Sequence, residues 1–140
     1  MLDGKIYIFG PDGLFSFDPA TGAWETDLPL PVSGSSFRFR LHRPAPTHRR
    51  PRAQEGGGVG SAQVAAHNGC VWVIGGVDST RCCYFSPAAG TWTEAPPLPT
   101  PQSWGAAWST EAGLLCIGGA HWHEEAETYH FDNRVFRLVE

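Results

Sequence analysis

The chain has 140 residues, of which 41% are hydrophobic and 17% are charged, with 17 Gly, 12 Pro and 6 Trp. This length allows one domain with a modest core, and the many turn formers and aromatic residues favour short strands over helices. No apolar run has the length of a membrane span, and residues 1–9 lack the apolar core of a signal peptide.

The cysteines all lie in apolar or strand-like stretches and indicate the compartment of the protein. They are Cys70, Cys82, Cys83 and Cys116. Buried, reduced thiols suit this pattern better than a disulfide framework, so we expect an intracellular protein. The expected location is the cytoplasm, with the cytoskeleton and the nucleus as alternatives.

One phrase, a turn followed by an apolar run and then by glycine, occurs three times. Its copies are Asp3–Gly10, Asn68–Gly76 and Ala112–Gly119. Such apolar runs are typical of strands covered on both faces, and the closing glycine is needed where a side chain would clash or where φ is positive. We therefore expect a structural role for the closing glycines, which are Gly10, Gly75, Gly76, Gly118 and Gly119.

A turn phrase and an aromatic residue follow each apolar run in the same order. The turn phrases are Phe17-Asp18-Pro19, Phe85-Ser86-Pro87 and Phe131-Asp132-Asn133, and the aromatic residues after them are Trp24, Trp92 and Phe136. Asp-Pro and related pairs form turns, so each phrase predicts a third strand joined to a fourth. A large ring on the fourth strand can wedge between neighbouring sheets, which gives Trp24 and Trp92 a predicted structural role.

This order of phrases resembles the kelch repeat: a strand of small residues, an apolar strand ending in Gly-Gly, an aromatic-Asp-Pro turn, Gly-x-Trp and a proline-rich link. The spacing from Gly69 to Gly113 is 44 residues, loosely within the period of about 40–50 residues for propeller blades. No Trp is followed by Asp, which disfavours the WD40 repeat. The resemblance implies an all-β fold, a partial β-propeller of about three four-stranded blades. Closed propellers have about 4–8 blades, so the chain is too short to close one.

The resemblance divides the chain into three repeats and one insert. Residues 1–32 form an incomplete first repeat, 33–60 the insert, 61–103 the second repeat and 104–140 the third. The expected strands lie near 5–9, 14–18, 23–27, 61–66, 70–74, 81–86, 91–95, 104–109, 114–118, 127–132 and 135–139. An open arc leaves unpaired sheet edges, which predicts a truncated chain of marginal stability.

The insert differs from the rest of the chain in charge. Residues 33–60 carry six arginines and one acidic residue, Glu55, so they contribute +5 to a net charge of −4. Their density of Pro, Arg and Gly predicts disorder. The alternative is a basic arm that binds nucleic acid or an acidic partner.

No pattern in the sequence predicts an enzyme or a cofactor. The strongest candidate for a metal site is His121 with His123 and the nearby His130, because alternate residues share one face of an extended segment and His is a common Zn ligand. The cluster falls between the second and third strands of its repeat, so we interpret it as a solvated loop without a metal. We find no acid–base pair, phosphate loop or nucleophile elbow.

Kelch propellers that resemble this chain bind partner proteins with the loops of one rim, so we expect a non-catalytic protein–protein interaction module and no membrane contact. The contact candidates on those loops are Asp78, Ser79, Arg81, Gln102, Trp104, His121, Trp122 and His123. Many such propellers belong to proteins that also carry N-terminal BTB and BACK domains and that bring substrates to a cullin ubiquitin ligase. The present sequence shows neither a BTB nor a BACK segment. The alternatives are an actin-binding or cytoskeletal kelch protein, and a non-functional or regulatory truncated isoform.

Overall fold

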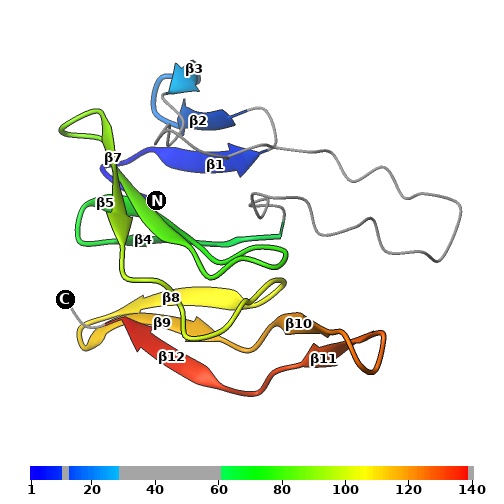
Figure 1. Ribbon diagram of the computed structural model, residues 1–140. Coiled ribbons are helices and arrows are strands. Elements are labelled where there is room, and N and C mark those ends of the chain that lie inside the picture. The colour runs from blue at the N-terminus through cyan, green and yellow to red at the C-terminus, as the bar shows by residue number, and fades with distance from the viewer. Residues whose placement is uncertain (11–12, 29–60, 139–140) are drawn as a thin grey trace, which may run out of the picture.

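The computed structural model describes residues 1–10, 13–28 and 61–138. Within them, twelve strands form four antiparallel sheets, three of which are stacked along the molecule (Figure 1). The all-β class is therefore confirmed, and each of the eleven predicted strands has a counterpart within two residues. None of the described residues belongs to a helix long and apolar enough to cross a membrane. The insert 33–60 lies outside the described residues.

The first sheet has three strands in chain order. They are β1 (Ile6–Gly10), β2 (Gly13–Asp18) and β3 (Ala23–Leu28). The turn between β2 and β3 is built as the Asp-Pro phrase predicts. The amide of Gly22 donates to the carbonyl of Asp18 at 2.8 Å, and the Asp18 carboxylate accepts from the amide of Ala20 at 2.8 Å.

The second sheet is a complete four-stranded meander. Its strands are β4 (Gln63–His67), β5 (Cys70–Ile74), β6 (Cys82–Ser86) and β7 (Thr91–Ala95). Asn68 and Gly69 join β4 to β5 with φ angles of 46° and 72°, as a two-residue hairpin with a primed turn requires. Gly90 donates to the carbonyl of Ser86 at 2.8 Å, which repeats the turn of the first sheet.

The third repeat differs from the expected meander. Its sheet has the order β8 (Ala106–Thr110), β9 (Gly113–Ile117) and β12 (Val135–Leu138). A separate hairpin of β10 (Ala120–His123) and β11 (Thr128–Phe131) stands between β9 and β12 in the chain. The prediction that the strand near 127–132 follows the second strand within the sheet was wrong, because β12 pairs with β9 while β11 pairs with β10.

The backbone pairing around the Gly118-Gly119 doublet accounts for this difference, since the Gly75-Gly76 doublet of the second sheet has similar φ angles of 69° and 118°. Gly118 and Gly119 have positive φ, 62° and 110°, so the chain bends there without ending the ladder. Gly118 donates to the carbonyl of Arg134 at 3.0 Å, and Asp132 donates to the carbonyl of Gly119 at 2.8 Å. The hairpin is thus a bent continuation of the β9–β12 pair, whereas the second sheet closes the same position with the short loop 75–81.

Two layers of core fill the spaces between the three stacked sheets. Between the second and third sheets lie Trp72, Ile74, Cys82, Leu98, Leu114 and Cys116. Between the first and second lie Leu14, Val71 and Phe85, with Trp92 packed against them. Strand β5 is covered on both faces as predicted, because it lies in the middle sheet.

The outer sheets are covered on one face only, in contrast to the prediction for their apolar strands. Ile6 and Ile8 of β1 are 39% and 44% exposed, and Ile117 of β9 is 41% exposed. Trp92 wedges between sheets as predicted, but Trp24 is 57% exposed. No described sheet lies beyond the first sheet to cover the Trp24 ring, which packs on Phe17 with centroids 4.8 Å apart.

The cysteines are all free thiols, and three of them are buried, as the sequence predicts. Burial raises the pKa of Cys83 to about 12 and that of Cys116 to about 11. The pKa of Cys82 is also raised by burial. Because the thiolate is the reactive form, these three side chains should be chemically inert.

We expect iodoacetamide to alkylate Cys70 of the native chain first and to leave Cys82, Cys83 and Cys116 largely unmodified. Cys70 is half-buried, whereas the other three are both buried and held as thiols. Peptide mapping by mass spectrometry gives the rate at each site, and the urea-unfolded chain, in which the four should react alike, is the control. Labelling of Cys83 as fast as Cys70 in the native chain would contradict this packing.

Candidate functional site

Three segments meet at one end of the second and third sheets, and together we call them the rim. They are the loop 75–81, the link 96–105 and the β10–β11 hairpin. Their backbones are joined by hydrogen bonds from Leu98 to Thr80 at 2.7 Å and from Gly76 to Gln102 at 2.8 Å. Ala120 and Ser103 form a mutual pair at 2.7 and 3.0 Å. The rim is therefore one hydrogen-bonded unit.

The glycine doublets let the link approach the sheets this closely. A Cβ on Gly75 would lie 2.3 Å from the carbonyl oxygen of Gln102, and one on Gly119 would lie 2.7 Å from that of Ser103. Both glycines also have positive φ. Gly75 and Gly119 thus meet both conditions that the sequence analysis gave for a glycine, a close backbone approach and a left-handed conformation.

Two of the contact candidates are buried, so the expectation that they are exposed was wrong. Ser79 is 4% exposed and Gln102 is fully buried. Gln102 accepts a hydrogen bond from Nε2 of Gln63 at 3.2 Å, and its backbone amide donates to the Ser79 carbonyl at 3.3 Å. These residues hold the link against the sheets. Gln63, the first residue of β4, belongs to no motif that could have indicated this role.

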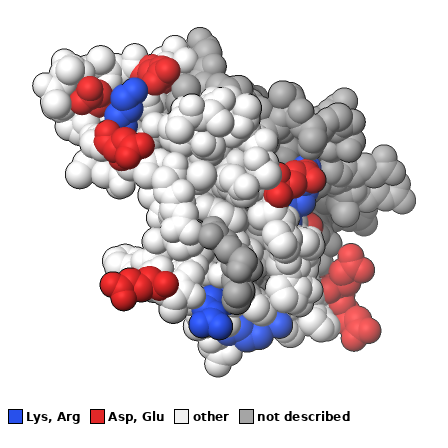
Figure 2. Space-filling model, turned by 90° about the vertical axis from the view of Figure 1, so that its left-hand side faces the viewer, with Lys and Arg blue, Asp and Glu red and all other residues white. Residues whose placement is uncertain are grey.

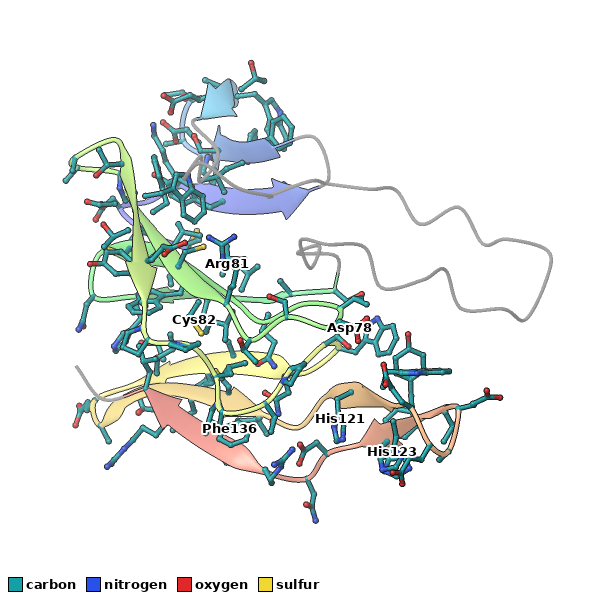
Figure 3. The ribbon with its side chains drawn as sticks, in the orientation of Figure 1. Asp78, Arg81, Cys82, His121, His123 and Phe136 are labelled. Atoms are coloured by element: carbon teal, nitrogen blue, oxygen red, sulfur yellow. The ribbon has the colours of Figure 1, made fainter. Side chains whose placement is uncertain are left out.

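Asp78 and Arg81 lie in or beside the loop of the second sheet (Figure 3). Asp78 is exposed and has a φ of 55°, a conformation that Asp tolerates better than most residues. The Arg81 guanidinium pairs with the Glu94 carboxylate on β7. Asp78 is thus an exposed residue of the rim, and Arg81 is ion-paired within its own sheet.

One face of the β10–β11 hairpin carries an aromatic cluster of Trp104, Trp122 and Tyr129. Tyr129 lies opposite Trp122 in the ladder, and their ring centroids are 5.0 Å apart at an angle of 75°. Trp104, which comes from the link, packs edge-on against the same tyrosine at 4.8 Å. Trp104 is 53% exposed and has a φ of 57°, so the backbone accepts strain to hold a large ring at the surface.

The opposite face carries three histidines, and the interpretation of this segment as a loop was wrong because it is a strand. His121 and His130 are paired across the ladder, and His123 stacks on His130 with centroids 4.4 Å apart. The predicted alternation of His121 and His123 on one face is confirmed (Figure 3). Nδ1 of His123 accepts from the amide of Ala126 at 3.2 Å.

No group of three His, Cys, Asp or Glu side chains in residues 1–10, 13–28 and 61–138 is placed to hold a metal ion. The rings of His123 and His130 lie nearly parallel, at 17°, a stacking contact that does not aim their nitrogen atoms at one point.

Tyr129 is the rim residue that the sequence analysis missed. Its segment was assigned to an inner strand of the third repeat, where a tyrosine would be a packing residue. The signal that could have located it is the alternation of His121, Trp122 and His123 followed by Tyr129 and His130, which is typical of a two-stranded hairpin with different faces.

An ion pair fixes the base of the hairpin. The Asp132 carboxylate accepts from Nε of Arg134 at 2.7 Å and from the Arg134 amide at 2.9 Å. Nη2 of Arg134 also donates to Oγ1 of Thr100 at 3.2 Å, which ties the hairpin to the link. The Arg134 guanidinium lowers the pKa of the Asp132 carboxyl from 3.8 to about 2.

No protein-family model and no curated protein sequence matches this chain.

The ion pair at the base of the hairpin predicts a pH-dependent stability. Because the folded pKa of Asp132 is depressed to about 2, its contribution is complete above the unfolded pKa and is lost as the pH falls through about 2. We expect Asp132→Asn to lower the free energy of unfolding at about pH 7 and the difference from wild type to shrink as the pH approaches about 2.

Urea unfolding followed by tryptophan fluorescence measures this difference. Glu111→Gln, a matched change at an exposed turn residue, serves as the control and should not alter the unfolding free energy at neutral pH. A constant difference between Asp132→Asn and wild type across the acid range would show that the carboxylate charge does not stabilise the hairpin.

Proposed function

We propose that this chain is part of a kelch-type β-propeller and acts as a non-catalytic protein-binding module. Three features support the propeller. Antiparallel sheets stack face to face, and glycine doublets with positive φ close the second strands of two of them. In the first two sheets the outer strand carries a tryptophan paired with phenylalanine, Trp24 with Phe17 and Trp92 with Phe85. These regularities are what the resemblance implies for successive blades.

The observation that carries the binding function is the aromatic cluster at the hairpin, in which Trp104 is exposed and Trp122 and Tyr129 are half-buried. Trp122 and Tyr129 lie on a hairpin that the first two repeats lack within the described residues, and Trp104 of the link packs against Tyr129. Tryptophan and tyrosine are enriched in binding hot spots because they bury a large area at a small cost in side-chain entropy. The rings pack against one another, and the link that carries Trp104 is hydrogen-bonded to the sheets. The cluster is therefore preorganised for binding.

The proposed partner is a protein, and the hairpin would supply the centre of the contact. His121 and His123 extend the surface on the other side of the hairpin, and Asp78 extends it along the rim. A role as the substrate-binding part of a cullin ubiquitin ligase is an extension of this proposal that comes from the family resemblance. It requires BTB and BACK domains in the same assembly, because the rim would bind substrate and not cullin.

The rim is tested by the double substitution Trp122→Ala with His123→Ala, compared with Trp108→Ala. Trp108 is 67% exposed on β8 and lies outside the aromatic cluster, so its removal takes away a ring of the same type that is more exposed than Trp122. We expect proteins captured from a cell extract by the wild-type chain to bind at least about tenfold more weakly to the double variant and unchanged to Trp108→Ala.

Quantitative mass spectrometry of the captured proteins, with circular dichroism of each variant, measures this effect. A partner that binds the folded double variant as well as it binds wild type would exclude the hairpin as the contact surface. Equal losses in both variants would indicate non-specific capture by exposed tryptophan and would also count against the proposal.

A further inference from the structure

The third sheet has one strand fewer than the second. Strands β2, β6 and β12 occupy equivalent places, since each pairs with the second strand of its repeat: Phe17 with Ile6, Phe85 with Val71 and Leu138 with Leu114. On the other side, β2 pairs with β3 and β6 pairs with β7. Among the described residues, no strand pairs with the second edge of β12.

In the first and second sheets, the strand at the equivalent edge carries a tryptophan. Trp24 of β3 lies opposite Phe17, and Trp92 of β7 lies opposite Phe85 with ring centroids 5.4 Å apart. Trp92 fills the space between its own sheet and the preceding one, against Leu14 and Val71. By the same register, a tryptophan on a strand added to β12 would lie opposite Leu138 and point toward the second sheet.

A cleft lies where that tryptophan would go. It has a volume of about 570 Å³ and is bounded by the end of β12 and by the face of the second sheet that is directed toward the third. Its lining residues are Asn68, Cys70, Trp72, Tyr84, Glu94, Ala95, Pro96 and Leu138. Trp72 and Tyr84 stack in its wall with centroids 4.7 Å apart. The cleft is open to solvent on one side, and its lining is mostly apolar, with Asn68 and Glu94 as polar members.

The charge on the face of β12 opposite the cleft bears on the residue after the tryptophan, whereas the cleft itself is lined by one acidic residue, Glu94. In the first sheet, Glu25 follows Trp24 and lies opposite Ser16, from whose hydroxyl its carboxylate accepts at 3.1 Å. The equivalent residue of β12 is Arg137, which is exposed. On the side of the molecule where β12 ends, basic side chains gather over the third sheet on a sparsely charged surface (Figure 2). Oppositely charged residues directly across a ladder stabilise it.

We propose that the free edge of β12 and this cleft bind an extended segment of a second protein in which tryptophan is followed by an acidic residue. The segment pairs antiparallel with β12, its indole enters the cleft against Leu138, Tyr84 and Ala95, and its carboxylate lies opposite Arg137. Backbone hydrogen bonds supply affinity and the pocket supplies specificity, as in other cases of strand addition. This surface meets the rim at Pro96, and the proposal does not depend on the function proposed for the rim.

A fluorescent peptide with the sequence of residues 21–27, Thr-Gly-Ala-Trp-Glu-Thr-Asp, tests the proposal by fluorescence anisotropy with the full chain. We expect saturable binding, and at least about tenfold weaker binding of the peptide with Trp24→Ala. A peptide with Glu25→Arg should also bind more weakly, and the protein variant Arg137→Glu should restore its binding. That charge exchange depends on the register between the two strands and not on peptide composition.

A protein variant that fills the cleft gives an independent test. Ala95→Phe should abolish binding, whereas Ile8→Phe, which adds a ring at an exposed position of the first sheet, should leave it unchanged. Urea unfolding shows whether each variant is folded. If Ala95→Phe is unfolded, the charge-exchange experiment still tests the proposal. No saturable binding, binding that survives Trp24→Ala, or a folded Ala95→Phe chain that still binds would overturn the proposal. The proposal would also be overturned if the chain dimerised through this edge, became a monomer with Arg137→Glu and did not bind the peptide. The occupant of the edge would then be a second copy of the chain.

Discussion

The close approach of the link 96–105 to the glycine doublets is the contact on which the rest of the structure depends. The carbonyl oxygens of Gln102 and Ser103 lie so close to Gly75 and Gly119 that a Cβ on either glycine would clash with them. This contact joins the second sheet to the third, because the same short segment bonds to Gly76 on one side and to Ala120 on the other. The rim exists because backbone meets backbone here without side chains between them.

The stacking of the sheets follows from that connection and from the alternation of side chains along each strand. Val71 and Phe85 point toward the first sheet, whereas Trp72, Ile74 and Cys82 point toward the third. The middle sheet is thus apolar on both faces and the outer sheets on one. Exposed Ile6, Ile8, Trp24 and Ile117 are the consequence at the two ends of the stack. Exposed apolar surfaces of this kind are typical of sites that contact another protein element.

Much of this fold could be predicted from the sequence, because turn chemistry and glycine placement are local signals. The doublets, the Asp18 turn and the position of Trp92 all follow from short-range sterics and hydrogen bonding. The hairpin β10–β11 could not be predicted by matching repeats, because the third copy continues its ladder where the second copy closes it. Whether Gly118-Gly119 ends a strand or bends it depends on the pairing of residues more than ten positions away.

The candidate site was predictable only in part for the same reason. Trp104, Trp122 and His123 were found because they fall between apolar runs, which places them at one end of the sheets. Tyr129 was missed, and Ser79 and Gln102 were wrongly expected to be exposed, because sequence spacing locates a loop but does not give the direction of its side chains. Burial of Gln102 depends on Gln63, which is distant in the chain and has no motif.

The most direct test of this account compares the free energies of unfolding of Gly75→Ala and Gly90→Ala. Both glycines have nearly the same positive φ, 69° and 65°, so both variants carry a backbone strain of about 1–2 kcal/mol. A Cβ at Gly90 meets nothing within 4 Å, whereas one at Gly75 meets the Gln102 carbonyl at 2.3 Å. The account predicts that Gly90→Ala folds with a loss of that order and that Gly75→Ala loses at least about 2 kcal/mol more or fails to fold. Equal losses in the two variants would show that the close contact between link and doublet does not hold the sheets together.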